Sequence, residues 1–179
     1  VKETVATMND GLHFAGDNGN TVIDKTLNQK LEIVGGADAT KLTDNNIGVN
    51  AKDGKLQVQL AKDLNGLSSV EVKDDNGAST VMKGDTIKSK DAAGNTSVVN
   101  GSGVTITPAN PQNPNAGTVS LTTEGLNNGN NQIKGVAAGT ADTDAVNLGQ
   151  LKKSNAQLAN ASANVETETQ RVGAHAAAM

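Results

Sequence analysis

The chain has 179 residues, enough for one ordinary domain or two small ones, but its composition does not suit a compact monomer. Aromatic residues make up 1% of the chain, with Phe14 as the single example, and apolar residues make up 35%. Globular domains usually contain about 45–50% apolar residues, and aromatic side chains supply much of their buried area. The net charge of −4 and the scattered basic residues exclude a nucleic-acid-binding surface. We therefore expect several chains to share one core.

Three absences from the sequence narrow the class of protein further. The chain has no Cys, so it forms neither disulfides nor thiolate metal sites. It has no apolar stretch close to 18 residues, so no transmembrane helix is predicted. It begins at Val1 without Met or a signal peptide. We expect it to be an internal segment of a longer protein.

The first ten residues are predicted to form a helix. Val1, Val5 and Met8 have helical spacing, and Asn9-Asp10-Gly11 is a stop signal. We interpret residues 1–10 as the end of a preceding stalk helix that enters a β region.

From residue 11 to about residue 117, short apolar runs alternate with turn dipeptides, which is typical of an all-β body. Asp53-Gly54, between two of these runs, is a strong hairpin signal. Pro108, Pro111 and Pro114 predict a rigid loop, and a further strand over 118–122 precedes a Gly/Asn-rich turn over 125–131. The main predicted strands are 12–14, 30–34, 47–51, 55–60, 70–72, 81–82, 86–89, 97–99 and 104–107.

The C-terminal region has the heptad spacing of a coiled coil over residues 148–179. We assign Leu148, Asn155, Ser162 and Thr169 to position a, and assign to position d the residues Leu151, Leu158, Val165 and Val172. Asp142-Thr143-Asp144 is expected to supply the N-cap and early negative charge for this helix. One chain cannot bury a heptad seam alone, so an oligomer is required. The predicted core of the coiled coil is Leu148, Leu151, Leu158, Val165 and Val172.

The connector over residues 135–151 resembles the neck of trimeric autotransporter adhesins, the Hia/YadA-like surface fibres of Gram-negative bacteria. Residues 118–134 resemble the Gly-Ile-Asn β-prism module of that family, with Leu126 in place of Ile. Residues 11–117 resemble its ring-type β head, which is named for a tryptophan that this chain lacks. Residues 171–179 resemble the start of the membrane anchor. The neck residues that the resemblance assigns to trimerisation are Val136, Gly139, Thr140, Asp142, Asp144, Ala145, Val146, Asn147, Gln150 and Leu151.

This resemblance implies a mainly β head (a β-prism or interleaved trimeric β structure) followed by a parallel trimeric α-helical coiled coil. The expected partner is the chain itself, in a homotrimer at the bacterial cell surface, held in the outer membrane by a C-terminal anchor absent from this chain. The implied function is attachment to host cells, extracellular matrix proteins or other bacteria, with no nucleic-acid partner. Two alternatives stay open: a structural spacer without its own ligand, and a segment of a phage tail fibre.

The sequence predicts no enzyme, metal site or cofactor. His13 and His175 lie at opposite ends of the chain, and no Ser or Thr has a plausible base and orienting acid. The weak calcium-loop pattern of 74–77 has Val72 where an Asp is needed, and a type I′ turn explains it better.

Asn155 is a candidate either for a register-setting layer, the better-precedented role, or for an axial anion site. Phe14 is expected to be buried in the core of the β body.

Overall fold

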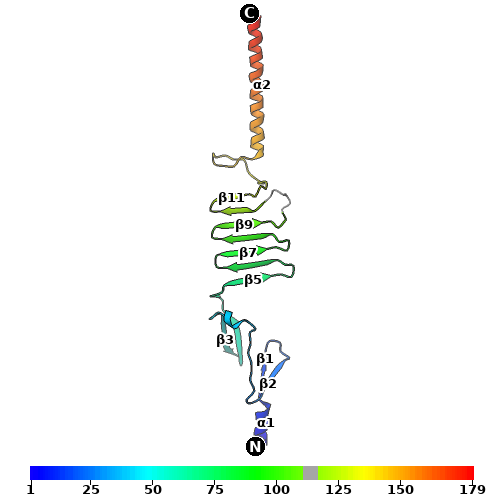
Figure 1. Ribbon diagram of the computed structural model, residues 1–179, viewed down its shortest axis with the longest axis vertical. Coiled ribbons are helices and arrows are strands. Elements are labelled where there is room, and N and C mark those ends of the chain that lie inside the picture. The colour runs from blue at the N-terminus through cyan, green and yellow to red at the C-terminus, as the bar shows by residue number, and fades with distance from the viewer. Residues whose placement is uncertain (111–116) are drawn as a thin grey trace. The chain divides into compact units, whose positions relative to one another are not determined.

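The computed structural model describes residues 1–110 and 117–179, so Pro111 and Pro114 of the expected rigid loop lie outside the described residues (Figure 1). The chain divides into two units, Val1–Leu67 and Ser68–Met179. The first contains helix α1 (Lys2–Asp10), where the spacing of Val1, Val5 and Met8 predicts one. The second ends in helix α2 (Leu148–Ala178). The β-rich architecture with a C-terminal helix agrees with the sequence prediction.

Two antiparallel hairpins form the β structure of the first unit. Strand β1 (Leu12–Ala15) pairs with β2 (Val22–Lys25), and β3 (Ile47–Lys52) pairs with β4 (Lys55–Leu60). Asp53 and Gly54 have φ values of 52° and 71°, the two positive values of a type I′ turn, so the predicted hairpin is confirmed. A 3₁₀ helix, η1 (Ala39–Lys41), lies between the hairpins.

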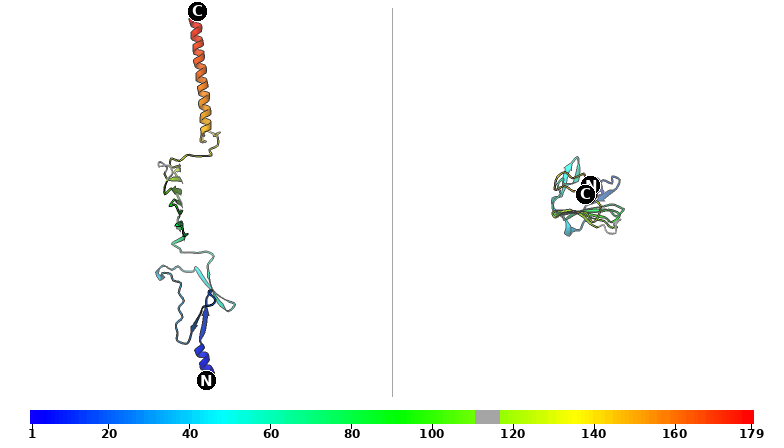
Figure 2. Two further views of the ribbon diagram at one scale, coloured as in Figure 1. Left: turned by 90° about the vertical axis from the view of Figure 1, so that its right-hand side faces the viewer. Right: turned by 90° about the horizontal axis from the view of Figure 1, so that it is seen from above.

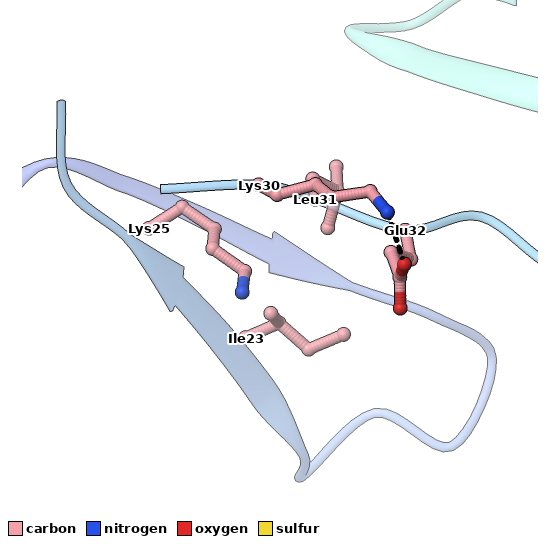
Figure 3. Close-up of a pocket in the computed structure, with 5 residues that line it drawn as sticks. All are labelled: Ile23, Lys25, Lys30, Leu31 and Glu32. Carbon is pink, nitrogen blue, oxygen red and sulfur yellow. Dashed lines mark hydrogen bonds and ion pairs between the residues drawn. The ribbon is translucent and has the colours of Figure 1, made fainter. Parts of the chain in front are cut away.

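The predicted strand over residues 30–34 is absent. This segment crosses the β1–β2 hairpin, where Leu31 approaches Ile23 and Lys25 of β2 across a shallow hollow flanked by a Lys30–Glu32 ion pair (Figure 3). A strand needs a neighbouring edge to pair with, and the described part of the chain offers none at this place. Ile33 is left 91% exposed.

The base of the β3–β4 hairpin is closed by a side-chain amide. Asn46 is 7% exposed, and its Nδ2 donates to the carbonyl oxygen of Asn65 at 2.8 Å. Its Oδ1 accepts the backbone N–H of Asn65 at 2.9 Å, so the amide pairs with this residue as a neighbouring backbone would. Thr43 Oγ1 donates to the same carbonyl oxygen at 3.2 Å. These contacts join the two ends of the hairpin segment.

The second unit contains a seven-stranded antiparallel meander, in which each strand pairs with its neighbours in the chain (Figure 1). Viewed along its plane, the meander forms a single layer (Figure 2). The described residues of this sheet extend from β5 to β11 and so cross the expected boundary at residues 117 and 118 between two head modules. Its strands are β5 (Ser69–Lys73), β6 (Ser79–Lys83), β7 (Thr86–Lys90), β8 (Thr96–Asn100), β9 (Gly103–Thr107), β10 (Val119–Thr122) and β11 (Gly125–Asn127).

Two loops of the meander repeat the same hydrogen bonds. Asp74 Oδ1 accepts the backbone N–H groups of Asn76 and Ala78, each at 2.9 Å. Asp91, 17 residues later in the chain, accepts the backbone N–H of Asn95 at 2.9 Å in the same way. The Asp74 loop is therefore longer than the two-residue type I′ turn that we predicted. Its carboxylate is already occupied by backbone donors.

The apolar side chains that the structure describes form no core within a single chain. No apolar side chain among the described residues is buried, and Phe14, expected in a core, is only half-buried. The accessible surface of 15452 Å² is about twice the roughly 8,000 Å² expected for a compact monomer of 18.1 kDa. The described apolar side chains are therefore left exposed in the single chain.

Candidate assembly site

The register of the meander aligns seven apolar side chains, one from each strand. Successive members are direct cross-strand partners, and side chains on a strand alternate between its faces, so all seven share one face of the sheet. Their exposed fractions run from 37% at Val104 to 62% at Leu126. We call this set the apolar row; its members are Val70, Met82, Ile87, Val99, Val104, Leu121 and Leu126.

A second row on the same face is polar at its centre. Thr80, Ser89 and Ser97 are cross-strand partners, and Thr80 Oγ1 lies 2.9 Å from Ser89 Oγ. Val72 continues this row on β5, and Ile106 continues it on β9. A hydroxyl that is already bonded to a neighbour can be covered at a lower free-energy cost than an unpaired one.

The opposite face of the meander, which we call the polar face, has a different composition. On the first three strands it presents Lys73, Lys83, Lys88 and Lys90, with Glu71 as an acidic residue 3.1 Å from Lys73. From β8 to β11 it presents mostly Thr, Ser and Asn. The sheet is therefore amphipathic, and the apolar row lies on the side that needs a cover. Burying seven such side chains is worth on the order of 10 kcal/mol per chain before entropic costs.

The neck is held to the start of helix α2 by the side chain of Gln150. Its Oε1 accepts the backbone N–H of Gly139 at 2.9 Å, and its Nε2 donates to the carbonyl oxygen of Gly139 at 2.9 Å. Gly139 is needed here, because a Cβ atom at this position would lie 2.8 Å from the carbonyl oxygen of Ala145. One amide thus fixes a backbone segment eleven residues away.

Asn147 caps helix α2 and reaches back into the neck. Its side chain accepts the backbone N–H of Gln150 at 3.0 Å, and Gln150 Oε1 accepts the backbone N–H of Asn147 at 3.2 Å, which completes a capping box. Its Nδ2 donates to the carbonyl oxygen of Val136 at 3.0 Å. The predicted cap at Asp142–Asp144 is therefore wrong.

Asp144 is not available as a cap because it closes a turn inside the neck. Its Oδ2 accepts the backbone N–H groups of Thr140 at 2.8 Å and Ala141 at 2.9 Å. These donors, that of Ala141 first, hold the pKa of the Asp144 carboxyl below its usual range. The carboxylate form is therefore the one that the neck stabilises.

The roles predicted for the other site residues concern contacts between chains, and they stay predictions. Asp142, Ala145 and Val146 are exposed in the neck. Asn155 is exposed on α2, and both proposed roles for it stay predictions. The predicted coiled-coil core is exposed in the single chain, with exposed fractions of at least 51%; it consists of Leu148, Leu151, Leu158, Val165 and Val172.

Sequence reasoning missed the apolar row and the two hydrogen bonds of the Asn46 side chain to Asn65. A 17-residue repeat was the available signal for the row, since Asp74 and Gly84 recur as Asp91 and Gly101.

Within the described residues, no group of three or more His, Cys, Asp or Glu side chains is arranged to hold a metal ion. In the same part of the chain no helix combines the length and apolar character needed to cross a bilayer.

The apolar row and the heptad positions of helix α2 both present apolar side chains that the described residues of a single chain leave exposed. Residues 132–174 match the family described as the coiled stalk of trimeric autotransporter adhesin. The C-terminal stalk of AtaA from Acinetobacter sp. Tol 5, solved as a fusion to GCN4 adaptors, is similar at 28% identity and a TM-score of 0.50. The match covers 72% of this chain and 34% of the AtaA chain, so this chain spans about a third of that structure. No curated protein compared with the chain matches it.

Both findings support a segment of a trimeric autotransporter adhesin. The family implies a homotrimer, and its members are exposed at the cell surface and anchored in the outer membrane. The family is one of structural adhesin stalks.

Proposed function

We propose that three parallel copies of this chain build one segment of a surface fibre that attaches bacteria to host cells, extracellular matrix proteins or other bacteria. The apolar row is the observation that carries the assembly part of this proposal. Three amphipathic sheets hide their apolar faces when these turn toward a common axis, which produces a β-prism with the polar faces in water. Three copies of α2 hide their a and d positions in the same way, as a coiled coil.

The neck connects these two kinds of core. A β-prism is wide and a three-helix coil is narrow, so each chain has to cross from one radius to the other within a few residues. The bonds of Gln150 to Gly139 and of Asn147 to Val136 give the connector a single conformation for that crossing. We propose that the neck residues act in trimerisation through this fixed geometry.

The assembly is tested by two substitutions at adjacent residues of β8. Val99 belongs to the apolar row, whereas Val98 lies on the polar face opposite Lys88. We expect V99E to weaken or abolish the trimer, because it places a charge in the shared core. V98E should leave the trimer intact and pair its new carboxylate with Lys88. Light scattering and thermal melting measure both, and equal behaviour of the two variants would refute the proposed face.

Attachment is the second part of the proposal. A fibre with three identical copies at each level, present many times on a cell, turns weak contacts into strong binding by multivalency. The polar faces and hairpin loops would present those contacts. The purified trimer should bind matrix proteins or host cells in a surface assay, and V99E, if monomeric, should lose most of that binding through lost multivalency.

A structural spacer is the second candidate function. It is favoured by the match of residues 132–174 to a stalk family and by the similarity to a structure titled as a stalk. Absence of binding by an intact trimer, together with shorter fibres and reduced adhesion in cells that lack only this segment, would support the spacer. The family match favours both of these over a phage tail fibre.

A further inference from the structure

His13 lies at the junction of helix α1 and the β1–β2 hairpin and contacts a carboxylate from each. Its Nδ1 is 2.6 Å from Asp24 Oδ1 on β2, and its Nε2 is 3.3 Å from Asp10 Oδ2 at the end of α1. His13 and Asp24 are direct cross-strand partners, so they share one face of the hairpin. The imidazole is thus placed between two elements of the structure.

The junction itself is tight. Gly11, between α1 and β1, has a φ of 75°, and a Cβ atom there would lie 2.3 Å from the carbonyl oxygen of Lys25. The chain therefore leaves α1 directly against β2, with only a 3.5 Å bond from the Gly11 N–H to the Thr7 carbonyl oxygen as a backbone cap. Contacts of the His13 ring supplement this weak cap.

The chemistry of the ring decides how many of its contacts can exist at once. A neutral imidazole has one N–H donor, whereas an imidazolium has two. Both partners of His13 are carboxylates, which only accept when ionised, so the two contacts are satisfied together only by the charged ring. Loss of the proton has to release one of them.

The two carboxylates next to the ring of His13 both favour its protonated form. Asp24 on β2 and Asp10 on α1 face it, whereas Lys25 belongs to the opposite face of the hairpin with Ile23. The hydrogen bond to Asp24 first, then the contacts of Asp10, raise the pKa of His13 above its ordinary value. Because the folded-state pKa is the higher one, the added stability is complete below about pH 6.5 and disappears as the pH rises through the folded-state value.

We propose that His13 is a proton-controlled bridge that holds α1 against the β1–β2 hairpin in mildly acidic surroundings and releases it as the ring deprotonates. The bridge makes the junction between a helix and a β region of the fibre stiffer at low pH. It concerns the behaviour of the fibre at one joint and does not depend on whether the segment is adhesive.

The titration of the ring gives the first test. The chain has two His residues, so the ring signals of His13 in the intact oligomer can be assigned by NMR as those that are lost in H13Q. We expect His13 to titrate above the ordinary histidine value of about 6.5, and D24N and D10N each to lower its pKa. D17N, which removes the same charge from the β1–β2 loop, should leave it nearly unchanged. A wild-type His13 that titrates at about 6.5 or below would overturn the proposal.

Amide exchange supplies a second readout that separates the bridge from a simple charge effect. After correction for intrinsic rates, amides of residues 8–14 should exchange several-fold faster at pH 8.5 than at pH 6.0 in the wild type. The ratio should approach one in H13Q, which cannot titrate. Persistence of the pH effect in H13Q would also overturn the proposal, whereas failure of V99E to affect assembly would bear only on the proposed function.

Discussion

At the scale of single residues, two side-chain amides take the place of backbone partners. Asn46 bonds both polar groups of Asn65, and Gln150 bonds both polar groups of Gly139. Each closes a loop without adding apolar surface, which suits a chain whose described residues form no core of their own. The amide is the one neutral side-chain group that can donate and accept in the same plane as a peptide.

Gly139→Ala should destabilise the neck by about 1–3 kcal/mol, the usual cost of forcing an extra methyl group into a packed site. The new Cβ would meet the carbonyl oxygen of Ala145 at 2.8 Å. Thermal unfolding followed by circular dichroism measures the change. Gly84→Ala, in a turn where a Cβ would meet nothing within 4 Å, is the matched control. Similar melting of both variants would show that the close approach is not tight in solution.

The Asp144 turn should open in acid. Its folded-state pKa lies below the unfolded-state value of about 3.9, so its contribution is complete above that pH and is lost as the pH falls through the folded-state value. Amide NMR shifts of Thr140 and Ala141 should move together in this range. In D144N both shifts should lack this transition, and an unchanged titration there would assign it to another group.

At the scale of elements, helix α2 begins with a cap that also belongs to the neck. Asn147→Ala should lower stability by about 1 kcal/mol per chain through loss of the cap alone, and further through loss of the bond to Val136. Asn160→Ala, on the exposed middle of the same helix, should be neutral or slightly stabilising because Ala has the higher helix propensity. Melting curves of the two variants, recorded at one protein concentration, should differ in sign.

Local sequence patterns predicted where helices and strands form better than they predicted which segments pair with one another. The hairpin at Asp53-Gly54 and helix α2 follow from turn chemistry and heptad spacing, which act within a few residues. The predicted strand over 30–34 was wrong, because alternation of apolar and polar residues does not show whether a neighbouring strand edge is available for pairing. Residues 125–127 form β11, although their Gly and Asn content favours a turn. The Asn147 cap was missed because Asp144, a good cap by type, is committed to the Thr140 turn.

The candidate assembly site, like the fold, could be predicted from the sequence only in part. The neck residues were found from a resemblance, but which of them bond to one another depends on Gln150 reaching back to Gly139 across the turn. The apolar row could not be derived from any single strand, because it exists only in the register between strands. The pairing of His13 with Asp24 has the same origin.

At the scale of the whole molecule, the folding of each chain and the association of the chains should occur as one process. With no buried apolar side chain among its described residues, a single chain has little to hold it together, so unfolding and dissociation are coupled. The melting temperature should fall when the protein is diluted, as measured by calorimetry over a hundredfold concentration range. A monomer in sedimentation experiments, with melting independent of concentration, would contradict this expectation and the assembly proposal together.

The 17-residue spacing between the Asp74 and Asp91 loops makes the length of the meander adjustable. One such unit carries two strands, and it begins and ends at equivalent places on the same edge. Deleting or duplicating it would move the flanking parts by roughly 10 Å, two strand spacings, while every remaining apolar side chain keeps a partner. The length of the meander can therefore be changed, by evolution or by design, in steps of one two-strand unit.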